Sequence, residues 1–152
     1  MLMTIQEKKK ILKDYAHIEK RVKELRDEVD MLQKLPTTIS PSVSGVPRGG
    51  NGDGNKVERA YEHLESLIIK LKKETDELIL LEHRIVEAIQ TLPNQLERRV
   101  LTLAYIGKCV PAMDGKTQNH RRLSLFNIAN EMSYSYDRIK QIHGSALSHL
   151  KL

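Results

Sequence analysis

Aromatic residues are scarce in this chain. Among its 152 residues there is no tryptophan and one phenylalanine, and aromatics make up only 4% of the sequence. Hydrophobic residues nevertheless account for 39% and charged residues for 30%. A core of Leu, Ile and Val combined with so much charge is typical of long amphipathic helices and coiled coils. The composition therefore favours an all-α fold.

Cysteine and long apolar runs are also nearly absent. The single cysteine, Cys109, cannot form an internal disulfide, which favours a reducing compartment. No apolar run approaches the roughly 20 residues of a membrane-spanning helix, and residues 1–10 lack the apolar core of a signal peptide. We therefore expect a cytoplasmic protein with no membrane partner.

The ionisable residues form no recognisable catalytic or metal-binding pattern. The six histidines do not cluster with Cys109 at a familiar zinc spacing. The carboxylates fall on predicted solvated helix faces, and no nucleophile has a visible base partner. The sequence therefore predicts no enzyme activity, no metal and no cofactor. The net charge of +5 fits an anionic partner such as nucleic acid, although so modest an excess does not identify one.

Residues 4–34 have the heptad pattern of a long helix, with steps that alternate between four and three. Mixed charges fill the other positions, as on a solvated face. Such a helix is about 45 Å long at 1.5 Å per residue, and it needs another helix to bury its apolar stripe. The stripe consists of Ile11, Tyr15, Ile18, Val22, Leu25, Val29 and Leu32.

Residues 35–55 are rich in proline, serine and glycine, with Pro36, Pro41 and Pro47 followed by a glycine-rich stretch at 49–54. A phosphate-binding loop needs a preceding strand and a following Gly-Lys-Ser/Thr, which this segment lacks. The composition therefore predicts a flexible linker.

A second long helix is expected over residues 55–91, with Asn55 and Glu58 as a capping box. The step from Leu78 to Leu81 is three residues where four is due, which resembles a stammer. The two long helices pack either as an antiparallel hairpin or across a dimer, and the heptads do not separate these options. The second stripe consists of Val57, Tyr61, Leu64, Ile68, Leu71, Thr75, Leu78, Leu81, Ile85 and Ile89.

Short helices are expected after Pro93, so we divide the chain into a long-helix region (1–91) and a small C-terminal domain (92–152). One helix covers residues 94–106 and ends at Gly107. A loop follows at 107–123, and Ser124 and Ser135 cap helices at 125–132 and 136–150. The inward residues of the first of these helices are Leu96, Val100, Leu101, Leu103 and Ala104.

The last two helices have the layout of a helix-turn-helix, whose second helix can enter the major groove of DNA. They are expected to share a core made of Ile128, Ala129, Met132, Ile139, Ile142, Ala146, Leu147 and Leu150. The exposed start of the second helix can then read base edges with Arg, Lys, Gln and Asp side chains. These candidate DNA-binding residues are Tyr136, Asp137, Arg138, Lys140 and Gln141.

Other residues of this domain are candidates for phosphate contacts. Tyr134, Ser135 and the helix N-terminus that follows them can hold backbone phosphates. Arg121 and Arg122 either contact phosphates or belong to a solvated loop.

Two stretches of this domain carry a resemblance to a known family. Residues 92–105, Leu-Pro-Asn-Gln-Leu-Glu-Arg-Arg-Val-Leu-Thr-Leu-Ala-Tyr, resemble the opening of region 4 of bacterial sigma-70 factors. Residues 128–150 resemble the second half of the same region. Taken whole, the chain is similar to small phage late transcription regulators of the RinA/ArpU type. That resemblance implies sigma-like control of phage late genes in a host bacterial cell, with double-stranded DNA and RNA polymerase as partners.

The chain departs from region 4 at three places. Ser133 stands where glycine is usual in the turn, Tyr136 stands where arginine is common, and the loop at 107–123 is longer. If the turn needs a left-handed residue, serine costs on the order of 1 kcal/mol there. Nothing resembles region 2, which melts promoter DNA, so a regulator fits better than a complete sigma factor.

Two functional hypotheses follow from the sequence. The first is a sequence-specific, homodimeric DNA-binding regulator of phage transcription. The second is a phage interaction factor whose coiled coil binds host RNA polymerase or another host protein without specific DNA binding.

Overall fold

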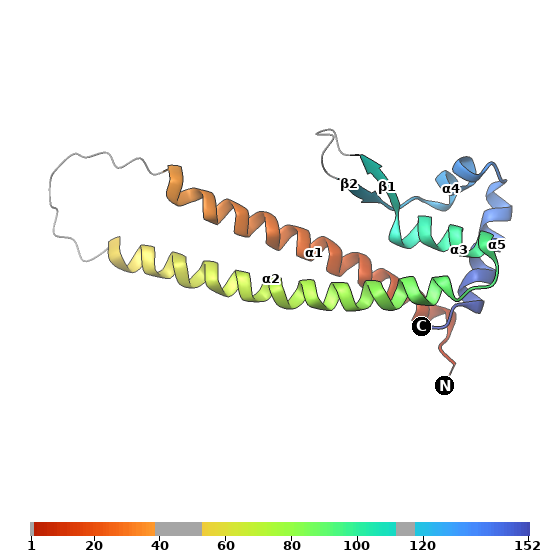
Figure 1. Cartoon of the computed structure of the whole chain (residues 1–152), viewed down its shortest axis with the longest axis horizontal. Helices are drawn as coiled ribbons and strands as arrows, with labels where there is room; N and C mark the ends of the chain where they lie inside the picture. The colour runs from red at the N-terminus through yellow and green to blue at the C-terminus, as the bar shows by residue number, and fades with distance from the viewer. Residues whose placement is uncertain (1, 39–52, 112–117) are drawn as a thin grey trace. The chain divides into compact units, whose positions relative to one another are not determined.

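The computed structural model describes residues 2–38, 53–111 and 118–152 (Figure 1), and the expected all-α fold is confirmed with the addition of one short β-hairpin. Two long helices come first and short helices follow. The helices are α1 (Ile5–Thr38), α2 (Asp53–Gln90), α3 (Gln95–Leu101), the π-helical turn η1 (Thr102–Ile106), α4 (Leu125–Met132) and α5 (Tyr136–His149). The strands are β1 (Lys108–Pro111) and β2 (Gln118–Arg121).

The chain forms two compact units. The paired-helix unit is His17–Ile79, and the head consists of Met1–Ala16 together with Leu80–Leu152. The boundary expected between residues 91 and 92 falls inside the head, because the first turns of α1 and the last turns of α2 belong to it. None of the helices in the described ranges is long and apolar enough to cross a bilayer.

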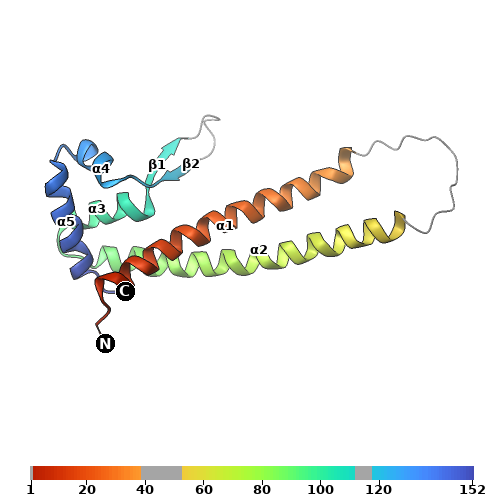
Figure 2. The same ribbon diagram turned by 180° about the vertical axis from the view of Figure 1, so that it is seen from behind.

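Within the paired-helix unit, α1 and α2 of the same chain lie side by side and antiparallel (Figures 1 and 2). Arg21 pairs with Glu74 while Glu28 lies 3.9 Å from His63, so numbers rise along α1 as they fall along α2. Between the helices is a core in which Leu25, Val29 and Leu67 are buried, flanked by Leu32, Leu64 and Leu71. In this unit the predicted apolar stripe of α1 therefore packs against a second helix, α2, as expected.

The predicted stripe of α2 is wrong in part. Val57, Tyr61 and Ile68 are exposed, whereas Leu67 and Glu74 are buried. The positions that turn inward are Leu64, Leu67, Leu71, Glu74, Leu78, Leu81 and Ile85, with steps of three and four that alternate without interruption. There is no stammer. The predicted stripe includes Thr75 because its neighbour Glu74 is charged. The structure instead buries Glu74 in the seam, and this one-residue error produces the apparent three-residue step.

The long helices also extend further than expected. α1 continues to Thr38 and α2 begins at Asp53, so both ends of the predicted linker are helical and Asn55 lies within the first turn instead of capping it. Pro36 is tolerated because it lies in the last turn of α1, where its missing N–H removes a single backbone bond. Residues 39–52 of the predicted linker lie outside the described residues.

In the head, α3, η1, α4 and α5 surround a core made of Val100, Ile128, Ala129, Ile139 and Ile142. Asn94 caps α3 by accepting a hydrogen bond from the Leu96 N–H at 2.9 Å. The predicted stop at Gly107 is confirmed: its N–H donates to the Thr102 carbonyl at 2.7 Å and its φ is 107°. A Cβ there would lie 2.9 Å from the Arg121 carbonyl carbon, so only glycine fits.

The loop expected over residues 107–123 is instead an antiparallel hairpin in its described parts. β1 pairs with β2 so that Lys108 lies opposite Arg121 and Pro111 opposite Gln118. The sharp turn at Gly107 and a bond from the Leu123 N–H to the Leu103 carbonyl (3.0 Å) bring the ends of the segment together. The strand ladder then satisfies backbone groups that an irregular loop would leave to water.

Candidate nucleic-acid interface

A tight turn joins α4 to α5 and fixes how the second helix starts. Both predicted caps are confirmed, since Ser124 Oγ accepts from the Asn127 N–H and Ser135 Oγ accepts from the Arg138 N–H, each at 3.2 Å. Ser133 between them is left-handed, with φ 58° and ψ 39°. The Tyr134 N–H donates back to the Ala129 carbonyl at 3.0 Å, which closes the end of α4.

Beneath this turn the predicted shared core is confirmed for the residues nearest the turn. Ile128 and Ala129 of α4 are buried against Ile139 and Ile142 of α5, with Met132 at the margin. Further along α5, Ala146, Leu147 and Leu150 are also buried. Ala129 has no side chain beyond Cβ, so the two helices can approach closely. The opposite face of α5 is thereby turned to solvent.

All seven residues predicted at the start of α5 and in the turn before it are exposed. They are Tyr134, Ser135, Tyr136, Asp137, Arg138, Lys140 and Gln141. Two contacts organise this surface: the Lys140 ammonium lies 5.4 Å from the centre of the Tyr136 ring, and Arg138 Nη1 lies 3.5 Å from Gln141 Oε1. Cationic and amide groups are therefore exposed together near a capped helix N-terminus, with Arg138 and Lys140 on opposite flanks of the exposed side of α5.

The two arginines predicted as phosphate contacts have different surroundings. Arg121 is exposed at the end of β2. Arg122 is half-buried: its Nε donates to the Tyr105 carbonyl at 2.6 Å, and its guanidinium lies 5.1 Å from the centre of the Tyr15 ring. Arg122 thus links α1 to η1 inside the head, which leaves Arg121 the better placed of the two to meet a phosphate.

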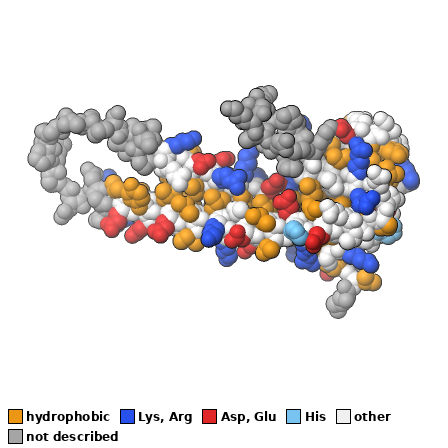
Figure 3. All heavy atoms as spheres, in the orientation of Figure 1, with side chains coloured by type: hydrophobic (Ala, Val, Ile, Leu, Met, Phe, Trp, Pro, Cys, Tyr) orange, Lys and Arg blue, Asp and Glu red, His pale blue; other side chains and the backbone are white. Residues whose placement is uncertain are grey.

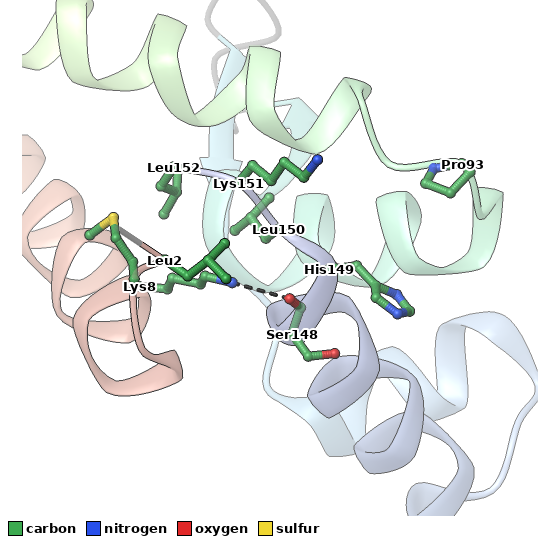
Figure 4. Close-up of a pocket in the computed structure, with 9 residues that line it drawn as sticks. Leu2, Lys8, Pro93, Ser148, His149, Leu150, Lys151 and Leu152 are labelled. Atoms are coloured by element: carbon green, nitrogen blue, oxygen red, sulfur yellow. Dashed lines mark hydrogen bonds between the residues drawn. The ribbon is translucent and has the colours of Figure 1, made fainter.

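Two buried charges that the sequence analysis did not single out hold the C-terminal half of α5. Lys8 Nζ donates to the carbonyls of Leu147 (2.9 Å) and Ser148 (3.2 Å). Figure 4 shows Lys8 reaching from α1 to this end of α5, beside a pocket of about 530 Å³. Lys8 lies one helical turn before the buried Leu12, but its charge gave no signal of burial in the sequence.

Glu97 of α3 is the second buried charge. Its carboxylate accepts from Ser145 Oγ at 2.7 Å and lies 3.1 Å from His149 Nδ1. Because α3 and α1 both bind the C-terminal half of α5, the exposed N-terminal half is held on a rigid support.

His143 of α5 contacts Tyr105 of η1. The Tyr105 hydroxyl lies 2.7 Å from His143 Nε2, and the rings are stacked with centroids 5.7 Å apart. Burial, and secondly the charge of Lys9, lowers the pKa of His143 below its ordinary value. Burial also raises the pKa of Tyr105. Both groups are therefore held in their neutral forms at pH 7.

The head is expected to lose stability as the pH falls through the ordinary histidine pKa of about 6.5. The pKa of His143 is lower in the folded head than in the unfolded chain, so the unfolded chain binds the proton first as the pH falls. The stability that neutral His143 gives the folded head above about pH 6.5 is therefore lost below it. The free energy of unfolding changes by at most about 1.4 kcal/mol per pH unit for this single proton. Urea midpoints from pH 8 to 5 should fall more steeply for the wild type than for His143→Gln. Equal slopes would contradict the prediction.

Ser133→Gly is expected to stabilise the head by about 0.5–1 kcal/mol, because a left-handed backbone strains serine but not glycine. The extra freedom of glycine in the unfolded chain offsets part of the gain. Urea unfolding of the two proteins measures the difference. Ser148→Gly, at an exposed helical position, is the matched control and should be destabilising. A loss of stability in Ser133→Gly would mean that the turn does not strain serine.

Comparison with known proteins adds no relative: no protein-family model, curated protein or solved structure matches this chain. Among the described residues, no group of three or more His, Cys, Asp or Glu side chains is placed to hold a metal ion. The candidate interface therefore stands on its own geometry.

Proposed function

We propose that this protein is a sequence-specific DNA-binding transcription regulator with a helix-turn-helix formed by α4 and α5. The observation that carries the proposal is the exposed face of α5, where Tyr136, Asp137, Arg138, Lys140 and Gln141 all face solvent while Ile139 and Ile142 on the opposite side are buried. One side of α5 thus packs on the core and the other is exposed to solvent, as is required of a helix that lies in the major groove of DNA.

The chemistry of this face supports DNA as the ligand. Arg138 and Lys140 can donate to guanine O6 and N7 or to phosphate, Gln141 can pair with adenine, and Asp137 can accept from cytosine. The N-terminus of α5 adds backbone N–H groups and a partial positive charge that suit a phosphate. Arg121 adds an exposed cation elsewhere in the head.

The setting of the regulator rests on the resemblance to sigma region 4 and to phage late regulators. On that basis the protein is phage-encoded and acts in the cytoplasm of the host bacterium on late phage genes, with RNA polymerase as its partner. A homodimer presenting two heads to two half-sites completes the proposal.

Selection from a random pool of duplex DNA tests the proposal without knowledge of the operator. The wild type should enrich a preferred sequence, and Arg138→Ala/Lys140→Ala should bind it at least tenfold more weakly. Lost phosphate contacts should also flatten the salt dependence, by about 0.9 in log–log slope for each contact. Lys23→Ala/Arg26→Ala, which removes two exposed cations from α1, controls for net charge and should bind normally.

Equal affinity of the α5 double variant and the wild type would remove α5 as the reading helix. If no sequence is enriched but purified bacterial RNA polymerase binds both proteins equally, the chain is an interaction factor instead. Either result contradicts the proposal.

A further inference from the structure

α2 carries a line of exposed apolar side chains within the paired-helix unit. Val57, Tyr61, Ile68 and Ile79 are 56%, 61%, 42% and 57% exposed, and we call these four residues the α2 ridge. At 3.6 residues per turn they fall within about 40° of one another around the helix. Figure 3 shows hydrophobic side chains open to solvent along the long helices. A surface helix normally places such a stripe against a partner.

α1 does not occupy this face in the described part of the chain. α1 packs on Leu67, which lies about 100° around the helix from Ile68. The Arg21–Glu74 ion pair and the Glu28–His63 contact lie on the other flank of the α1–α2 contact, away from the ridge. Leu64 and Leu71, which also pack in the core with Leu67, lie about 40° and 60° from Ile68, so the ridge is an exposed apolar strip beside the seam that α1 covers.

Three of the four ridge residues are spaced symmetrically about Ile68, whereas the position symmetric to Tyr61 holds the polar, half-buried Thr75. Val57 lies eleven residues before Ile68 and Ile79 lies eleven residues after it, while Tyr61 and Thr75 lie seven residues to either side. Two antiparallel copies of α2 that meet at Ile68 would therefore bring Val57 of each level with Ile79 of the other. The contact would extend for about 33 Å at 1.5 Å per residue.

Two charges beside the ridge follow this symmetry to within one residue. Glu65 and Lys72 are both exposed on the flank of the ridge away from α1, three residues before and four residues after Ile68. In the antiparallel pair Glu65 of each copy comes level with residue 71 of the other, one residue or about 1.5 Å from Lys72, which is close enough for two ion pairs. A parallel pair would place Glu65 of one copy and Lys72 of the other on opposite flanks of the contact and at different levels, so neither ion pair could form.

We infer that the α2 ridge is the contact surface for a second copy of this chain, bound through α2 in antiparallel orientation with Ile68 at the two-fold axis. The occupant is a second copy because both the apolar positions and the flanking charges complement themselves, as a two-fold interface requires. The inference does not rest on DNA binding, and its tests are made without DNA.

Light scattering after size-exclusion chromatography measures the mass. The wild type should have the mass of a dimer and Ile68→Lys that of a monomer with unchanged helical circular dichroism. Met31→Lys is the matched control, because Met31 is 70% exposed on α1, away from the ridge. It should stay dimeric. Glu65→Lys and Lys72→Glu should each weaken the dimer at least tenfold, and the double exchange should restore it.

Disulfide formation in a Cys109→Ser background tests the orientation. Ile68→Cys should cross-link to itself, and Val57→Cys should cross-link when mixed with Ile79→Cys but not alone. Self-cross-linking of Val57→Cys would show a parallel pair and overturn the proposed orientation. A monomeric wild type at every concentration, or a dimer that Ile68→Lys leaves intact, would overturn the interface.

Discussion

Lys8→Met is expected to destabilise the head by about 2–3 kcal/mol, although Lys8 is remote from the proposed DNA-reading face. The ammonium donates to the carbonyls of Leu147 and Ser148, which are among the last carbonyls of α5 and lack partners within the helix. Methionine keeps the apolar stem but leaves these acceptors buried and unpaired. The loss also removes a cation from the negative end of the helix dipole.

Amide hydrogen exchange in α5 measures this effect locally. A loss of 2 kcal/mol corresponds to exchange faster by about 30-fold in the amides that open with the head. Lys10→Met, at an exposed position of the same helix, makes the same chemical change and should leave exchange unaltered. Equal protection in Lys8→Met and the wild type would show that the two hydrogen bonds contribute nothing to the fold.

The structure also explains which features of the head were predictable from the sequence. The caps at Ser124 and Ser135, the stop at Gly107 and the buried side of α5 are set by neighbours a few residues away. Short-range preferences and the 3.6-residue period are sufficient for such features. The same period predicted which residues of α5 face solvent, so the candidate interface follows from the sequence.

Features that depend on distant partners were missed. The β1–β2 hairpin closes through the bond between Leu123 and Leu103, and Arg122 is held by Tyr15 and Tyr105. Lys8 is buried because the end of α5 supplies its acceptors 139 residues away. A pattern of hydrophobicity cannot identify a buried charge, since the residue type predicts exposure and only the partner makes burial possible.

Glu74, in the seam of α2, is another buried charge that the hydrophobic pattern did not identify. It is only 7% exposed, one carboxylate oxygen binds Arg21, and the other, Oε2, has no hydrogen-bond partner among the described residues. A buried ion pair with an unsatisfied oxygen is weaker than good apolar packing. Glu74→Leu is therefore expected to stabilise the paired-helix unit by about 1–2 kcal/mol, since leucine continues the seam from Leu67 and Leu71.

Arg21→Ala should have the opposite effect, a loss of about 2 kcal/mol, because it leaves the buried carboxylate without its cation. Arg21 itself is 58% exposed, so in Glu74→Leu it can return to water, and adding Arg21→Ala to that variant should change little. Lys20→Ala, which breaks an exposed pair with Glu24, is the control and should cost less than about 0.5 kcal/mol. Urea unfolding followed by helical circular dichroism compares these four variants with the wild type. A destabilised Glu74→Leu would show that the ion pair contributes more than the seam leucine that replaces it.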